Sequence, residues 1–463
     1  MGHHASRLFG LSPGAAVLLA VALVNGTAWA GEVEVLQQQV DRLEAELGRL
    51  KEQLNEVRRA QQEAARAQAA RNAAPEKTAD GKAVKVTTKP GIAVETEDGA
   101  FSAQIGGRIM VDSAWYGDDK SKLGDGTELR RARILVKGTL LTDWDYKVEV
   151  DFSGNDVSLK DVYIAYAGFD PAVFTLGNFK IPFSLEGQTS SKYITFMERA
   201  LSFAFVPGRK IGIGGWTHGD NWSAGAGLFG DAVGGDVDSE GNEAWHAGGR
   251  VTYAPLSGKT RSLHLGFGAV YGDPNNDTLG FLERPESHVT DVRFVTTGTI
   301  MGARAFYIVR PEVAAVLGPF AFQGEYTHTG VTRDRFDDVD FDGWYAEASY
   351  FLTGESRPFN PKRGNFGRLR PKASLGDGGL GAWQIAVRYS TIDLTDEDIL
   401  GGEEINVTLG LNWYLNPYVR LMLNTIWVDT DRNATGNALN TSSGETPGDD
   451  DPFIVQVRGQ IDF

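Results

Sequence analysis

The chain of 463 residues contains no cysteine, so no disulfide bond can hold its fold together. A β-barrel that closes on itself through backbone hydrogen bonds needs no such bond. The sequence also lacks a long apolar segment, because the one extended apolar run, Gly14 to Val24, falls short of the ~20 residues of a membrane-spanning helix. These absences exclude a disulfide framework and argue against a helical membrane protein.

Positive charge is scarce relative to negative charge. The chain has 45 lysines and arginines against 61 aspartates and glutamates, a net charge of -16 at pH 7. A protein that binds nucleic acid normally carries a clustered basic surface, so this balance argues against a nucleic-acid partner. It does not fix the charge inside a pore, where selectivity depends on the side chains that line the path.

Catalytic motifs are missing as well. The 7 histidines are scattered, and no HExxH, Walker loop or GxSxG stands at a strand-to-helix junction. His264 and Ser390 have the parity to reach the lumen rim of a barrel, but any large barrel offers such a coincidence, and a catalytic triad is recognised by its geometry. We therefore expect no catalytic residue, no cofactor and no metal site, and the protein is not predicted to be an enzyme.

Residues 1–30 have the pattern of a secretory signal peptide. Arg7 supplies an N-terminal charge, Ala15 to Val24 forms the apolar segment, and Ala28-Trp29-Ala30 matches the A-x-A cleavage pattern. The pattern predicts cleavage after Ala30 and export of the chain. An uncleaved N-terminal anchor is the alternative.

Residues 31–74 are predicted to form a coiled coil. Apolar residues follow one another at alternating spacings of four and three, as the seam of a coiled coil requires. These residues are Leu36, Val40, Leu43, Leu47, Leu50, Leu54 and Val57. A lone amphipathic helix is the alternative. Residues 75–100 are polar and include Pro75 and Pro90, and we interpret them as a linker.

From residue 101 to the C-terminus, apolar and polar residues alternate in sixteen runs, a pattern typical of β-strands. In Glu128 to Phe152, for example, one face of the hairpin is apolar and the other is charged. Such a face suits the core of a soluble sandwich or the lipid side of a transmembrane barrel. The runs are Phe101 to Tyr116, Leu129 to Leu141, Trp144 to Phe152, Leu159 to Gly168, Val173 to Ile181, Lys210 to His218, Trp222 to Phe229, Ala244 to Ala254, Ser262 to Tyr271, Ala303 to Val309, Phe320 to Val331, Trp344 to Leu352, Ala382 to Ile392, Glu404 to Leu415, Tyr418 to Val428 and Pro452 to Phe463.

The joins between the runs separate the two alternatives. Short joins such as Asn416-Pro417 alternate with long ones such as Ser184 to Arg209, as the periplasmic turns and external loops of an outer-membrane barrel do. The closing run also ends on an aromatic residue, Phe463, which resembles the assembly signal of such barrels. We predict an all-β, 16-stranded antiparallel transmembrane β-barrel over residues 101–463, in contact with the lipid of the bacterial outer membrane.

One join does not fit this alternation. Thr353 to Gly381 should be a short periplasmic turn, yet the segment is long and basic. Either the topology slips at this point, or the barrel carries an insertion that faces inward.

Basic residues recur at positions that face the water-filled lumen of the predicted barrel. They are Arg108, Arg131, Arg133, Lys147, Arg250, Arg388 and Arg458. Guanidinium groups match the geometry of phosphate oxygens and stay charged, so a row of them can pass oxyanions along a pore. The alternative is a general porin, in which acids such as Asp145, Glu149, Asp151 and Asp161 balance the arginines across the lumen.

Several segments of this sequence resemble the phosphate-selective porin O/P family. They are ELRRARI, NFKIPFSLE followed by GQTSSKYITFMERA, LTGESRPF, and GAWQIAVRYS with LGLNWYLNP. The resemblance implies a homotrimer of sixteen-stranded barrels whose third external loop folds into the pore. It also implies that basic residues of that pore pass inorganic phosphate or polyphosphate between them.

Carried over by motif, the resemblance implies that the anion path includes Arg108, Arg130, Arg131, Arg133, Lys180 and Arg199, to which strand parity adds Lys147. Parity favours Arg131 over Arg130 for the lumen. The constriction loop would run from Ser184 to Arg209. Acidic external loops depart from this picture, since residues 231–243, 334–342, 396–404 and 444–451 would repel anions at the mouth.

These observations together predict an outer-membrane porin that passes small anions, phosphate or polyphosphate among them, by passive diffusion through a basic constriction. The coiled coil would lie in the periplasm. The alternatives are a general porin, or a structural tether that uses the coiled coil to reach the cell wall.

Overall fold

The computed structural model of the chain describes residues 30–73, 76–77, 83–88, 91–234, 243–274, 279–431 and 449–463. The predicted signal peptide lies almost entirely outside the described residues. The chain divides into two units, residues 1–74 and residues 75–463.

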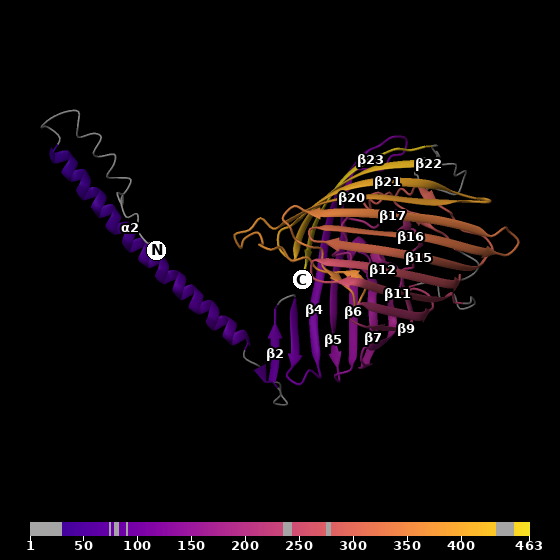
Figure 1. Ribbon diagram of the computed structural model, residues 1–463, viewed down its shortest axis with the longest axis horizontal. Coiled ribbons are helices and arrows are strands. Elements are labelled where there is room, and N and C mark those ends of the chain that lie inside the picture. The colour runs from indigo at the N-terminus through magenta and orange to yellow at the C-terminus, as the bar shows by residue number, and fades with distance from the viewer. Residues whose placement is uncertain are drawn as a thin grey trace, which may run out of the picture. The chain divides into compact units, whose positions relative to one another are not determined.

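The first unit contains the long helix α2 (Ala30–Ala73) (Figure 1). The seam residues from Val40 to Val57 are exposed along it, and Leu43 and Leu50 each expose 63% of their surface. In a coiled coil, leucines at this spacing pack against partner helices. The exposed leucines of α2 are therefore compatible with the coiled coil, which remains a prediction. Within the described parts of the chain, no helix is long and apolar enough to cross a membrane.

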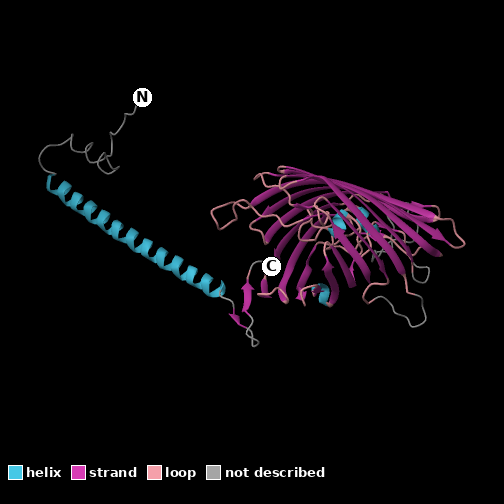
Figure 2. Ribbon diagram, turned by 60° about the horizontal axis from the view of Figure 1, so that its bottom comes forward, coloured by secondary structure: helices cyan, strands magenta, loops and turns pink. Residues whose placement is uncertain are grey.

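The second unit is a closed barrel of 16 antiparallel strands (Figures 1 and 2). Each strand pairs with the next along the chain, and the last pairs with the first. Every predicted run coincides with one of them, which confirms the fold class. The strands are β4 (Ser102–Gly117), β5 (Gly126–Leu140), β6 (Trp144–Asp151), β7 (Ser158–Phe169), β8 (Ala172–Lys180), β9 (Arg209–His218), β10 (Trp222–Phe229), β11 (Trp245–Ser257), β12 (Arg261–Asp273), β15 (Ala303–Leu317), β16 (Phe320–Arg333), β17 (Val339–Phe351), β20 (Ala382–Asp396), β21 (Ile399–Tyr414), β22 (Val419–Asp431) and β23 (Phe453–Asp462).

The alternation along the strands places apolar side chains outside and polar side chains inside. On β4, Ile105 and Ile109 expose 46% and 43% of their surfaces, whereas Arg108 and Asp112 are buried. In a soluble sandwich the apolar face would be the buried one, so this inverted pattern identifies a barrel that faces lipid.

The predicted linker over residues 75–100 is partly β-structure, which corrects that interpretation. It contains β1 (Glu76–Lys77), β2 (Ala83–Thr87) and β3 (Ile92–Thr96), and β3 pairs with the first residues of β4. The pairing of β23 with β4 reaches Gly107, which pairs with Phe463, and the preceding residues of β4 pair with β3 on the same side. Open backbone N–H and C=O groups favour the addition of a strand, and β3 supplies one.

The long join between β17 and β20 is an inward-facing insertion. The two strands pair directly with each other, so the topology does not slip. The insertion, residues 352–381, contains the short hairpin β18 (Phe359–Asn360) and β19 (Asn365–Phe366). Its Arg357 and Phe366 are buried, and Arg357 pairs with Glu347 on the inner wall of β17.

Candidate functional site

The segment between β8 and β9, residues 181–208, lies inside the barrel; we call it the lumen loop. It carries α3 (Leu185–Gln188) and the 3₁₀ helix η2 (Leu201–Phe205), and Figure 2 shows helical turns within the ring of strands. Ser184, one end of the predicted constriction loop, is buried and caps α3 by accepting a hydrogen bond from the backbone N of Gly187. The other end, Arg209, is the first residue of β9.

Strands on the far side of the barrel hold the middle of the lumen loop. Arg420 on β22 donates to the carbonyl oxygen of Ile194 at 2.8 Å, and Asn424 accepts from the backbone N of Met197 at 2.8 Å. Arg388 on β20 donates to the carbonyl oxygen of Glu198 at 3.1 Å. Because these bonds use backbone groups of the loop, they fix its path across the lumen.

Two inward-facing glycines, Gly248 on β11 and Gly268 on β12, lie against the beginning of the lumen loop. A Cβ atom at Gly248 would lie 2.2 Å from Cγ2 of Ile181, and one at Gly268 would lie 2.8 Å from Cδ2 of Phe183. Both distances are shorter than van der Waals contact. The absence of side chains on β11 and β12 at these two positions therefore makes the room in which the loop turns inward.

Glu198 anchors the lumen loop to the opposite strands. Its carboxylate accepts two hydrogen bonds from Arg130, at 2.8 and 2.9 Å, and one from Arg458 at 2.6 Å, and it pairs with Arg131 at 3.6 Å. Burial alone would raise the pKa of this carboxyl, but the three arginines outweigh it and hold the pKa well below its ordinary value.

The place of Arg130 corrects the parity argument, which favoured Arg131 alone for the lumen. Met110 pairs with Arg131, whereas its neighbour Val111 pairs with Leu129, so Arg130 is the extra residue of a β-bulge. A bulge places two consecutive side chains on the same side of a sheet. Both arginines therefore reach Glu198 inside the barrel.

We predict that the lumen loop stays anchored in moderately acidic solution. A carboxyl with a depressed folded pKa contributes stability above its unfolded pKa, and this contribution is lost as the pH falls through the folded pKa. Since the pKa of Glu198 lies well below 4.5, single-channel conductance should be the same at neutral pH and at about pH 4.5. A Glu198→Gln variant, which lacks the charge, should show a raised and fluctuating conductance at both values. A conductance of the parent channel that rises over this interval would contradict the role of Glu198.

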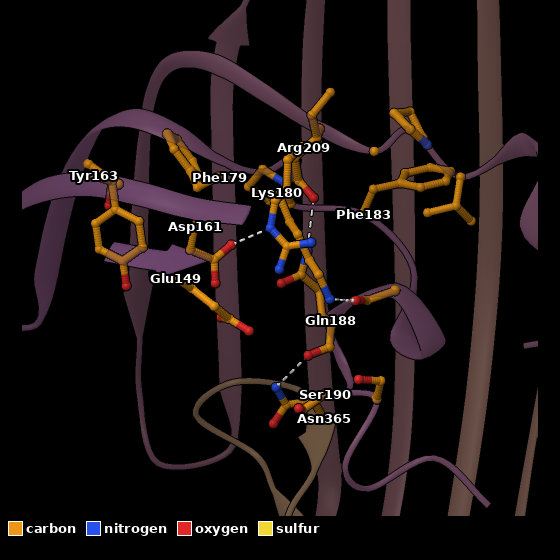
Figure 3. A pocket seen from close by; sticks show the side chains of 18 of the residues that line it. Glu149, Asp161, Tyr163, Phe179, Lys180, Phe183, Gln188, Ser190, Arg209 and Asn365 are labelled. Carbon is orange, nitrogen blue, oxygen red and sulfur yellow. Dashed lines mark hydrogen bonds and ion pairs between the residues drawn. The ribbon is translucent and has the colours of Figure 1, made fainter. Parts of the chain in front are cut away.

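A cavity of about 460 Å³ lies between the lumen loop and the wall formed by β4 to β9 (Figure 3). Eight basic side chains and two carboxylates line it, so positive charge is in excess. The basic residues are Arg108, Arg131, Arg133, Lys147, Lys180, Arg199, Arg209 and Arg363, and the acids are Glu149 and Asp161. Six of the seven basic residues expected in the anion path, all but Arg130, thus meet in this cavity.

Carboxylates neutralise part of this charge. Glu149 pairs with Arg108 at 2.7 Å and with Lys147 at 2.9 Å, and Asp161 pairs with Arg209 at 2.5 Å. Arg133 pairs at 2.6 Å with Asp151, a carboxylate beyond the cavity lining.

Three cations of the cavity have no carboxylate partner among the described residues. Lys180 donates to the carbonyl oxygen of Gly187, and Arg199 donates to backbone oxygens of the lumen loop at 3.1 Å each. Arg363 is exposed in the cavity lining. Hydrogen bonds to neutral carbonyl groups leave the positive charge uncompensated, so these side chains can attract an anion.

Strand parity missed Arg363, because this residue lies in the insertion rather than on a strand. The carbonyl oxygen of Gly364 accepts from Arg250 at 2.6 Å, and that of Lys362 accepts from the indole N–H of Trp216 at 3.2 Å. Asn365 donates to the carbonyl oxygen of Gln188 at 3.1 Å, which joins the insertion to the lumen loop. The only sequence signal was the basic character of this unexpectedly long join.

The other basic positions expected in the relay, Arg250, Arg388 and Arg458, do not line the cavity. They are buried in the inner wall, where each pairs with a carboxylate: Glu312, Glu286 and Asp112 respectively. Their hydrogen bonds to loop backbone show that they position the loops.

The two residues considered for catalysis lie in these anchoring networks. His264 contacts Glu312 at 2.7 Å, and Ser390 donates to Glu286. Glu286 belongs to a second inward-folded loop, between β12 and β15, which carries β13 (Leu282–Glu283) and β14 (Val295–Thr296). His264 and Ser390 therefore bind different carboxylates.

Comparison with known proteins agrees with this architecture. The family model described as phosphate-selective porin O and P matches residues 103–463. Porin O of Pseudomonas aeruginosa is 28% identical over 423 residues, which cover 82% of this chain and 93% of that protein. An uncharacterised protein of Caulobacter vibrioides is 30% identical over 371 residues, covering 77% of this chain and 74% of its own.

Among solved structures, the anion-selective porin from Comamonas acidovorans superposes with a TM-score of 0.51 at 15% identity, covering 78% of this chain and 100% of that one. This likeness supports the barrel fold. The match to the family model, over residues 103–463, spans nearly the whole barrel, from β4 to β23. The chain therefore belongs to the phosphate-selective porin O and P family of outer-membrane porins.

Proposed function

We propose that this porin passes small anions, inorganic phosphate and polyphosphate among them, by passive diffusion through the basic cavity beside the lumen loop. The observation that carries the proposal is a set of three cations that have no carboxylate partner in the described part of the chain. They are Lys180, Arg199 and Arg363, in a lining with an excess of positive charge. Low-dielectric walls concentrate the field of such charges on the path of the permeating ion.

The order of the charges supports movement in steps. Lys180 and Arg199 lie where the lumen loop turns in from the external side, and Arg363 lies on the insertion from the periplasmic side. An anion can therefore exchange one cation for the next without leaving positive surroundings. Glu149 and Asp161 reduce the net charge of the lining, which keeps binding weak enough for release.

Competition between chloride and phosphate tests the phosphate part of the proposal. In a planar bilayer with potassium chloride on both sides, added inorganic phosphate should reduce the chloride current until the site is saturated. Arg363→Gln should raise the half-blocking concentration by about threefold to tenfold, because it removes one charge-assisted contact. A chloride current that falls only in proportion to dilution would instead support a general porin.

We also propose that the chain is a homotrimer whose coiled coil, Val35 to Val57, lies in the periplasm. The helix precedes the first strand, and an even number of strands places both barrel ends on the periplasmic side. The exposed apolar seam supports association of helices from three chains.

Sedimentation of a peptide covering residues 31–74 checks the association. The peptide should sediment as a trimer, whereas a variant carrying Leu43→Asp and Leu50→Asp should be monomeric, because two charges in a seam cost more than a short coiled coil gains. Ala45→Asp, on the exposed face opposite the seam, is the matched control and should leave the trimer intact. A monomeric parent peptide would mean that the helix does not drive assembly.

A further inference from the structure

Aromatic side chains line the cavity beside the cations. They are Tyr163, Phe179, Phe183, Phe203 and Trp216. Tyr163 and Phe179 come from neighbouring strands with ring centroids 6.3 Å apart, and Trp216 lies on the next strand. Figure 3 shows Tyr163 and Phe179 on one side of the Asp161–Arg209 pair and Phe183 on the other.

Packing buries Phe183 but leaves the other four rings partly accessible. Phe179 contacts Phe229 with ring centroids 5.1 Å apart. The ring centroid of Phe203 lies 4.6 Å from the guanidinium carbon of Arg199. Phe179, Phe203 and Trp216 nevertheless remain only half-buried at a cavity that they line. The lining therefore combines uncompensated cations with accessible aromatic surface.

Passage of inorganic phosphate alone does not account for this combination. A fully hydrated oxyanion gains nothing from an aromatic surface, and apolar surface in a water-filled path is costly. Aromatic walls with a few convergent polar groups are typical of sites that bind organic molecules, and a volume of about 460 Å³ lies within their usual range.

We infer that the cavity binds organic anions in which an oxyanion group carries a planar apolar group, the class to which aryl phosphates belong. The oxyanion group would lie against Lys180, Arg199 and Arg363, and the planar group against Phe179 and Trp216. The inference rests on the proposed anion path and extends it to a substrate class. Contact with the rings would make such anions bind more tightly than inorganic phosphate of equal charge.

The test measures how strongly phenyl phosphate and inorganic phosphate block the current through the full-length protein in planar bilayers at neutral pH. Phenyl phosphate should reach half-block at a concentration about threefold to tenfold lower. Phe179→Leu should remove most of this difference and leave the block by inorganic phosphate unchanged. Phe174→Leu is the matched control, because Phe174 lies on the same strand and exposes 49% of its surface on the lipid-facing side.

Trp216→Leu gives the same test should Phe179→Leu fail to fold. Equal half-blocking concentrations for the two anions in the parent channel would overturn the inference and leave the proposed phosphate path standing. Equal loss of affinity in Phe179→Leu and Phe174→Leu would overturn it as well, because the lipid-facing ring cannot touch a permeating anion. Absence of block by either anion would refute the phosphate path itself.

Discussion

Replacing Lys180 and Arg363 together with glutamate should lower the preference of the channel for anions over cations by about tenfold or more. Both cations line the cavity without a carboxylate partner among the described residues, so each substitution exchanges an uncompensated positive charge for a negative one. A single unit charge a few ångströms from a permeating ion contributes on the order of 1 kcal/mol even at the dielectric constant of water. The double variant reverses two such charges.

Reversal potentials in a salt gradient measure the change. Arg370→Glu is the matched control, because Arg370 is exposed on the same insertion but does not line the cavity. It should leave the selectivity of the channel unchanged. Resistance of the folded barrel to detergent before heating shows that each variant has assembled. If the double variant and the control had the same reversal potential as the parent, cations other than these would set selectivity.

The substitution Gly248→Val should narrow the pore. A Cβ atom at this position would lie 2.2 Å from Ile181, so the beginning of the lumen loop must move away from the wall. The barrel closes through strand hydrogen bonds that do not involve this contact, so the strands should still assemble. We expect the single-channel conductance to fall about twofold or more, because the displaced loop moves into the cavity between it and β4 to β9.

Gly249→Val provides a control one residue away on the opposite face of the same strand. A Cβ atom there meets a backbone oxygen at 3.3 Å and Cβ of Ala226 at 3.5 Å, contacts that small shifts can relieve. Its conductance should equal that of the parent. An assembled Gly248→Val channel with parental conductance would show that the lumen loop does not set the narrowest section.

The barrel could be predicted from the sequence because lipid outside and water inside impose a period of two on every strand. Errors occurred where local residues break the period. One predicted run ended at Val309, whereas β15 continues to Leu317. Pro311, which lacks an N–H and is unusual inside a strand, lies within β15 opposite Phe267. Similarly, the bulge at Arg130 shifts parity by one residue and could not be read from the alternation.

The candidate site could be predicted only in part. Parity finds which cations face inward, but whether a cation is neutralised depends on which carboxylate lies opposite it across two or three strands. Arg108 and Arg458 look alike in sequence, and each pairs with a carboxylate. Arg108, paired with Glu149, nevertheless lines the cavity, whereas Arg458 is held in the wall by Asp112 and by Glu198 of the lumen loop. Arg363 lies on an insertion without periodicity, so only the three-dimensional fold places it in the cavity.

The reversal potential of the unmodified channel in a gradient of potassium chloride tests the central claim most directly. Excess positive charge in the narrowest section should admit chloride and repel potassium, so the zero-current potential should lie close to the equilibrium potential of chloride. A zero-current potential of the opposite sign, toward the equilibrium potential of potassium, would contradict the claim of anion selectivity. The uncompensated cations of the cavity would then not control which ions pass.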